Sequence, residues 1–273
     1  MPAADLATTD PWSLLLAFAI ALVAGAMNSI AGGGTILTYP VIFALVGDGK
    51  VANITSTLGL WPGSLGGAWG YRREMRPQLH RFTSFFVISL VGGGVGSLLL
   101  LWTTARAFER LVPFLILLAT SAFMAQSFLA EWLARRRGEP ATAPGPSRWL
   151  LVVALQWVVA VYGGYFGAGI GIMMLALLGF LGLTNLFEMN GLKNLGALCV
   201  NGVAIVQFVV ADRFVARTVD WPIVGVMGVG AILGGYGSAG LARRIGPRAA
   251  RMVIIVVGLG GAAWTAWKTW GSG

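Results

Sequence analysis

One lysine lies where a charged side chain is costly, inside a hydrophobic part of the chain. Lys193 belongs to the segment 188–194, which leads into a long uncharged stretch. A central lysine costs roughly 2.5–3.5 kcal/mol on membrane-insertion scales, so such a residue usually has a function. Intervals of three, four and seven residues place a polar stripe on one helical face; it consists of Asn190, Lys193, Asn194 and Asn201. We expect Lys193 to supply charge, and the asparagines hydrogen bonds, to an anionic ligand.

Two plainer interpretations stay open for Lys193. Its long side chain could reach the membrane surface, or its amine could pair with Glu188, five residues earlier. The stripe favours the functional interpretation, because an apolar environment would not tolerate so many polar side chains without a polar cavity.

Two glycine-rich sequences interrupt the longest hydrophobic stretches. Gly32-Gly33-Gly34 lies within 11–47, and the segment 167–171 lies within 149–187. A helix needs about 20 residues to cross a bilayer core of about 30 Å, so each stretch must break or fold back. A helix that starts after such a break presents unpaired N–H groups and the positive end of its dipole. The two breaks could therefore meet at mid-membrane and bind an anion.

Polar residues and glycines near the breaks complete the predicted substrate site. Around the breaks they are Asn28, Ser29, Gly32, Gly33, Gly34, Thr35, Tyr165, Gly169 and Gly171, and on the following stretch Asn53, Thr55 and Ser56. The alternative for the break glycines is close helix packing, since small residues are enriched at membrane helix contacts. Packing is the preferred interpretation for the glycines within 93–96 and 234–237, and for the intramembrane Trp61 and Trp157.

The elements that must position these residues are membrane helices. Hydrophobic residues make up 57% of the chain and charged residues only 11%, against roughly 25% charged in soluble domains. The charge-free stretches are 11–47, 51–71, 82–105, 111–130, 149–187, 194–211, 221–242 and 252–267. They predict an all-α polytopic membrane protein that has eight full spans with two broken or re-entrant segments, giving eight to ten membrane segments.

The chain contains an ordered internal repeat. A shift of 137 residues places Asn53 on Asn190, and Ser56 on Lys193. We expect a first membrane repeat over 1–131, a basic, proline-rich cytoplasmic linker over 132–147, and a second membrane repeat over 148–273. Two passes for each long stretch would invert the halves and leave twelve basic residues inside against six outside; one pass each would make the halves parallel, with eleven against seven. The positive-inside rule slightly prefers inversion, and paired broken segments favour it further.

Several classes of function do not fit the sequence. The net charge of +9 comes from residues that flank hydrophobic stretches, so loop orientation and lipid headgroups explain it better than nucleic acid. His80 is the sole histidine and Cys199 the sole cysteine, and the chain has no phosphate-binding loop. We therefore expect no enzyme, no cofactor and no metal site.

The order of several motifs resembles the TauE/SafE sulfite exporter family. In the first half these are residues 31–34 with Pro40, and residues 61–64 through 71–74; in the second half they are 190–194 with Asn201, and 219–221. The resemblance runs from about residue 13 to 268. It implies a multi-pass carrier of the inner membrane that exports sulfite or small organosulfonates.

The leading hypothesis is a secondary transporter for a small sulfur-containing anion that works by alternating access. Its expected partners are the anionic substrate, membrane lipids and, through Glu188, a coupling proton; a homo-oligomer is compatible with the sequence, and nucleic acid is not expected. An anion channel would use the same site without a carrier cycle. A scaffold without transport activity would tolerate apolar replacement of the polar stripe.

Overall fold

The computed structural model describes residues 10–30, 33–135, 145–245 and 247–271. Within these ranges the chain is helical and has no strand. The elements in chain order are α1 (Pro11–Ile30), α2 (Gly34–Val46), α3 (Gly49–Gly70), α4 (Arg72–Met75), the 3-10 helix η1 (Arg76–Gln78), α5 (Thr83–Trp102), α6 (Ala105–Arg135), α7 (Pro146–Tyr165), α8 (Ile170–Phe180), α9 (Leu186–Phe214), α10 (Trp221–Ile245) and α11 (Pro247–Trp270).

Five of the described helices are long and apolar enough to cross a membrane: α1, α5, α6, α7 and α9. Three shorter apolar segments are α2, α8 and Trp221–Tyr236 of α10. The predicted all-helical, polytopic class is confirmed. The number of full spans and the inverted relation of the halves stay predictions, as do the domain boundaries; α6 extends into the predicted linker as far as Arg135, and α7 begins at Pro146.

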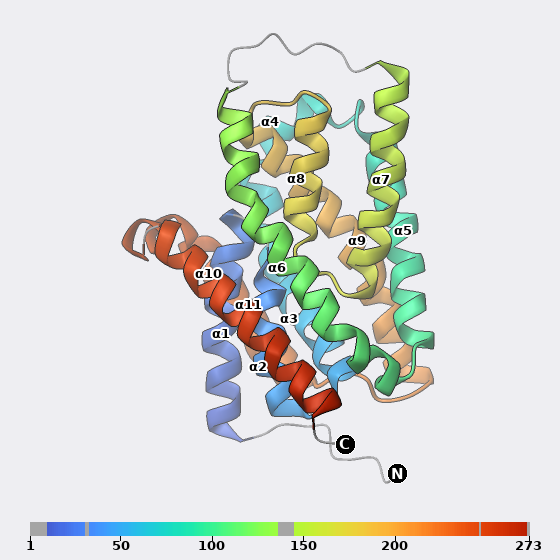
Figure 1. The fold of residues 1–273 in the computed structure, drawn as a ribbon, viewed down its shortest axis with the longest axis vertical. Coiled ribbons are helices and arrows are strands. Elements are labelled where there is room, and N and C mark those ends of the chain that lie inside the picture. The colour runs from blue at the N-terminus through green and yellow to red at the C-terminus, as the bar shows by residue number, and fades with distance from the viewer. Residues whose placement is uncertain (1–9, 31–32, 136–144, 246, 272–273) are drawn as a thin grey trace.

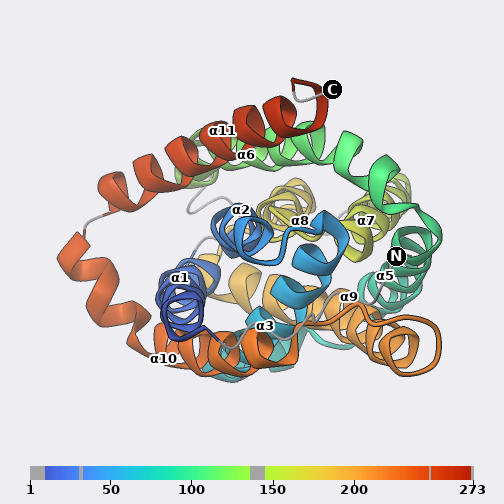
Figure 2. The same cartoon turned by 90° about the horizontal axis from the view of Figure 1, so that it is seen from below.

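Both long hydrophobic stretches are interrupted at the glycines. The first consists of α1 and α2, and the second of α7 and α8. With 13 and 11 residues, α2 and α8 are too short to cross the bilayer. Figure 1 shows α1 and α2 reaching one end of the molecule and α7 and α8 reaching the other. Seen along the long axis, α2 and α8 lie inside a ring of longer helices (Figure 2).

Glycines allow the helices to approach closely at three places. Helix α1 packs most extensively against α10, and α7 against α5. A Cβ atom on Gly234 would collide with the carbonyl oxygen of Leu22, and one on Gly96 with that of Val161. A Cβ atom on Gly93 would lie 2.8 Å from Cα of Val200. The packing interpretation therefore holds for these three glycines.

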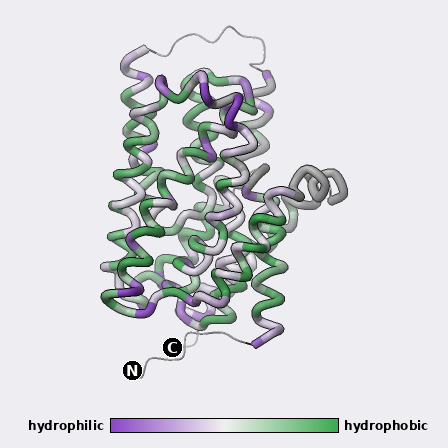
Figure 3. The backbone as a smooth tube through the Cα atoms, turned by 180° about the vertical axis from the view of Figure 1, so that it is seen from behind, coloured by the Kyte–Doolittle hydropathy of each residue, from purple (hydrophilic) through white to green (hydrophobic). Residues whose placement is uncertain are grey.

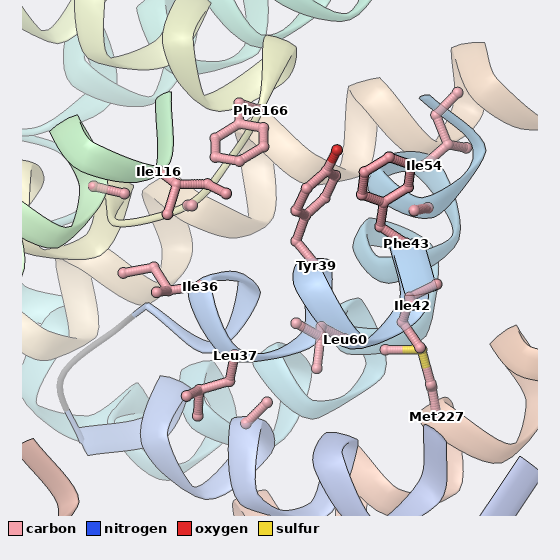
Figure 4. Close-up of a cluster of buried hydrophobic side chains, with 14 of the residues drawn as sticks. Ile36, Leu37, Tyr39, Ile42, Phe43, Ile54, Leu60, Ile116, Phe166 and Met227 are labelled. Carbon is pink, nitrogen blue, oxygen red and sulfur yellow. The ribbon is translucent and has the colours of Figure 1, made fainter. Parts of the chain in front are cut away.

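The largest buried apolar cluster surrounds α2. Tyr39 packs edge-on against Phe166, which follows α7, with ring centroids 5.4 Å apart. Figure 4 shows these rings together with Ile116 and Met227, which come from distant parts of the chain. On the outside, large apolar side chains such as Leu150 and Val206 are exposed. Hydrophobic residues follow the length of the helices and hydrophilic ones gather towards the ends (Figure 3), as expected of a surface in contact with lipid.

Candidate functional site

Two short helices begin at the breaks, each after a glycine in the left-handed conformation. Gly33 precedes α2 with φ of 103°, and Gly169 precedes α8 with φ of 78°. Other residues avoid this conformation because their Cβ atom crowds the backbone, so glycine is required there. Neither N-cap residue provides a side-chain cap. At α2 the N–H of Gly34 donates to Oδ1 of Asn28 at 2.7 Å, so α1 and α2 are tied together across the break.

A cavity lies where the two breaks meet. It is lined from five helices and both breaks, by Asn28, Gly33, Thr35, Thr57, Leu60, Trp61, Ser64, Gly167, Ile170, Gly171, Lys193, Asn194, Ala197 and Asn201. Its empty volume, including the part open to solvent, is about 590 Å³. Thr35 in the first turn of α2 and Ile170 at the start of α8 both lie on its wall, so the positive ends of two helix dipoles are directed at the same space.

Lys193 is fully enclosed at this cavity. Its side chain is 1% exposed, and its Nζ has no hydrogen-bond partner among the described residues. The amine neither reaches the membrane surface nor pairs with Glu188, so both plainer interpretations are wrong. A buried charge without a counter-charge is strongly unfavourable, and an anion in the cavity would supply the missing partner.

Further unpaired donors accompany the lysine. Nδ2 of Asn194 and Nε1 of Trp61 are buried and have no partner in the described part of the chain. None of the lining residues is an aspartate or glutamate. The described residues also contain no cluster of three or more His, Cys, Asp or Glu side chains. Unpaired donors on a wall without carboxylates suit a ligand rich in anionic oxygen atoms.

The structure brings together about half of the predicted site. The predicted residues on the cavity wall are Asn28, Gly33, Thr35, Gly171, Lys193, Asn194 and Asn201. Gly34 and Gly169 adjoin it as the first residue of α2 and the N-cap of α8. Ser56 is buried and its Oγ lacks a partner, but it does not line the cavity. Gly32 and the side chain of Ser29 lie outside the described part of the structure.

The other predicted residues make structural hydrogen bonds away from the cavity. Nδ2 of Asn53 donates to the carbonyl of Tyr165 at 3.2 Å, where α7 ends. Oγ1 of Thr55 accepts from the N–H of Asp220 at 3.1 Å, just before α10. Nδ2 of Asn190 donates to the carbonyl of Leu186 within α9. The asparagine and the threonine of α3 thus hold the two halves together.

Sequence reasoning placed α3 in the site but chose the wrong face of this helix. Thr57, Trp61 and Ser64 all line it. They are spaced by four and three residues, so they share one helical face. This spacing, with a tryptophan whose N–H needs a partner when buried, is the signal that could have identified them.

Comparison with known proteins gives the family. The model of the sulfite exporter TauE/SafE family matches residues 17–265. A probable membrane transporter protein of Haemophilus influenzae is 24% identical over 245 residues, covering 89% of this chain and 91% of the relative. The probable membrane transporter protein YfcA of Escherichia coli K12 is 25% identical over 261 residues, covering 91% and 87%. No solved structure matches. The family match spans nearly all the described helices, so this multi-pass membrane chain belongs to the TauE/SafE sulfite exporter family.

Proposed function

We propose that the protein is a secondary transporter that exports a small sulfur-containing anion, sulfite or an organosulfonate, across the inner membrane. The family description, a sulfite exporter, supports the substrate class. The names of the relatives support transport. In this proposal Lys193 provides charge, and Asn194, Asn201 and Trp61 provide hydrogen bonds.

The observation that carries the proposal is the unpartnered amine of Lys193 beside two helix N-termini. Its Nζ is buried without a hydrogen-bond partner among the described residues, and the cavity also borders Thr35 of α2 and Ile170 of α8. Sulfite and sulfonates each carry three oxygen atoms on sulfur that accept charge-assisted hydrogen bonds. An anion of this kind would satisfy several donors at once.

We also propose that the halves are inverted repeats that rock around the cavity. The packing supports this, because the helix contacts are exchanged between the halves in a matched way: α1 packs on α10 while α7 packs on α5, and α3 packs on α10 while α9 packs on α5. Helices α3 and α9 contact each other, and both line the cavity. Rocking of one repeat against the other would open the site to each side in turn.

The direct test is flux of radiolabelled sulfite into proteoliposomes that contain the purified protein. We expect Lys193→Met to weaken apparent substrate affinity by about tenfold or more, because a hydrogen bond to a charged group contributes roughly 1.5–3 kcal/mol. Lys268→Met is the matched control; its amine lies 3.9 Å above the ring of Phe43 and lines no part of the cavity. If Lys193→Met and Lys268→Met transport sulfite equally well, Lys193 does not take part in the mechanism.

Electrical recording separates a carrier from a channel with the same site. A carrier gives slow, saturating flux in the same proteoliposomes, whereas a pore gives unitary currents. If unitary sulfite currents are seen and disappear in Lys193→Met, the site is correct but the protein is a channel rather than an alternating-access carrier.

A further inference from the structure

A second positively charged cavity lies at the end of the molecule where α4 is found (Figure 1). Its wall consists of Leu65, Ala68, Trp69, Arg72, Arg73, Arg76, Leu79 and Leu198. Three of these eight residues are arginines and none is acidic. We call this the arginine cavity. Its charge attracts an anion, and the remaining lining is apolar.

One arginine is held in place by the protein. The guanidinium of Arg72 donates to the carbonyl of Trp69 at 2.8 Å and lies 4.6 Å above the centre of its indole ring. Arg73 and Arg76 are exposed. The cavity therefore offers one oriented guanidinium and two that can adjust to a ligand. Each guanidinium can donate two parallel hydrogen bonds to two oxygens of a phosphate.

An apolar groove continues from the arginine cavity along α9. It is lined by Leu90, Leu198, Cys199, Gly202, Val203, Val206 and Gln207. Leu198 belongs to both walls, so the two hollows are adjacent. From Leu198 to Val206 the helix rises about 12 Å at 1.5 Å per residue. Val206 is 63% exposed on the outside of the molecule, where an acyl chain of the bilayer can reach the groove.

We propose that the arginine cavity and the groove together bind one anionic phospholipid. Its phosphate contacts Arg72, Arg73 and Arg76, and an acyl chain lies along α9 from Leu198 towards Val206. A free phosphate would use the arginines and leave the groove empty. A lipid uses both, since it joins a negative headgroup to a long apolar chain. This proposal does not depend on the transported substrate.

The lipid would contact the helices that build the central cavity. On α9, Ala197 and Asn201 face the central cavity, while Leu198 and Gly202 face the groove. On α3, Ser64 lines the central cavity and Leu65 the arginine cavity. Lipid on one side of these helices can therefore influence the position of the residues on the other side.

The test is native mass spectrometry of the purified, detergent-solubilised protein with added dioleoyl phosphatidylglycerol or dioleoyl phosphatidylcholine. We expect one phosphatidylglycerol to be retained in preference to phosphatidylcholine. In Arg73→Gln/Arg76→Gln we expect retention about fivefold weaker for each arginine removed, the equivalent of roughly 1 kcal/mol per basic residue. Arg135→Gln/Arg148→Gln removes the same charge from exposed positions outside the arginine cavity and should retain the lipid.

Two further measurements test the groove and the source of the phosphate. Leu198→Trp should fill the junction of the two hollows and lower retention of dioleoyl phosphatidylglycerol. Dihexanoyl phosphatidylglycerol, whose acyl chains have six carbons, should bind the unchanged protein less well than the dioleoyl lipid. Three outcomes would each overturn the proposal. The protein could retain phosphatidylglycerol and phosphatidylcholine equally, the two double arginine variants could lose lipid retention equally, or equimolar inorganic phosphate could displace the lipid. The arginine variants decide the matter even if Leu198→Trp does not fold.

Discussion

Lys193 is an energetically costly group that the fold buries at the wall of the central cavity. Insertion of a lysine into a membrane costs several kilocalories per mole, and burial without a partner does not repay that cost. The amine nevertheless lies beside Asn194 and Trp61, whose N–H groups also lack partners among the described residues. Three unsatisfied donors around one cavity indicate a ligand whose binding completes them.

A substitution at Trp61 tests whether its indole N–H binds the substrate. Trp61→Phe keeps an aromatic ring at the cavity wall and removes only the indole N–H. If the substrate accepts from that N–H, its apparent affinity in the flux assay should fall by about tenfold, in line with roughly 1.5 kcal/mol for a hydrogen bond to a charged group.

The control is Trp102→Phe, because Trp102 is 75% exposed at the end of α5. Both variants should fold with similar melting temperatures. If Trp61→Phe transports sulfite with unchanged affinity, the indole serves packing, as its sequence position first indicated.

Part of this site follows from residue types alone. Lys193 stands out because a charge within a membrane helix is rare, and its neighbours Asn194 and Asn201 follow from helical spacing. Asn53 and Thr55 are equally polar, but their partners are the carbonyl of Tyr165 and the N–H of Asp220. Those partners lie more than a hundred residues away, so only the folded chain could separate these polar groups from the ones that face the cavity.

At the scale of elements, the excess length of two hydrophobic stretches was sufficient to predict the breaks. A straight helix of that length would extend well beyond the bilayer, and the glycines marked where each would end. The structure adds the reason for their position: Gly33 and Gly169 adopt positive φ angles at the starts of α2 and α8. Which polar residues would meet at those starts depended on packing and was not available from the sequence.

A matched pair of glycines tests the function of the first break. Gly33 and Gly47 both have positive φ, at 103° and 79°. A Cβ atom on Gly33 would make only ordinary contact with Phe123, and one on Gly47 would meet nothing within 4 Å. Substitution by alanine should therefore introduce a comparable backbone strain at each position and destabilise the protein by about 1–2 kcal/mol.

Only Gly33 lines the central cavity. We expect Gly33→Ala and Gly47→Ala to lower the melting temperature to a similar extent, while only Gly33→Ala reduces sulfite flux, because it redirects the start of α2. Equal flux in the two variants at equal stability would show that the break does not contribute to binding.

At the scale of the whole molecule, the orientation of the two halves decides the mechanism. A shift of 137 residues pairs His80, which lies before α5, with Arg217, which lies before α10. Both are exposed. Figure 1 shows the segment near α4 and the connection between α9 and α10 at opposite ends of the molecule.

Cysteine labelling tests that orientation in intact cells. In a Cys199→Ala background, a membrane-impermeant maleimide should label Arg217→Cys directly and His80→Cys only after permeabilisation, since the arginine-rich end is expected inside. The two single variants serve as each other's control. Labelling of both from the same side would indicate parallel halves and would contradict the proposed rocking of inverted repeats.

The exchange of helix partners between the halves has a consequence for biogenesis. Helix α1 is synthesised well before α10, yet its most extensive packing is with α10. Until α10 is inserted, the glycine- and alanine-rich face of α1 has no helix to pack against. In the nascent protein this face therefore contacts lipid or an insertion factor. Truncation before α10 should therefore leave α1 unassembled and exposed to membrane proteases.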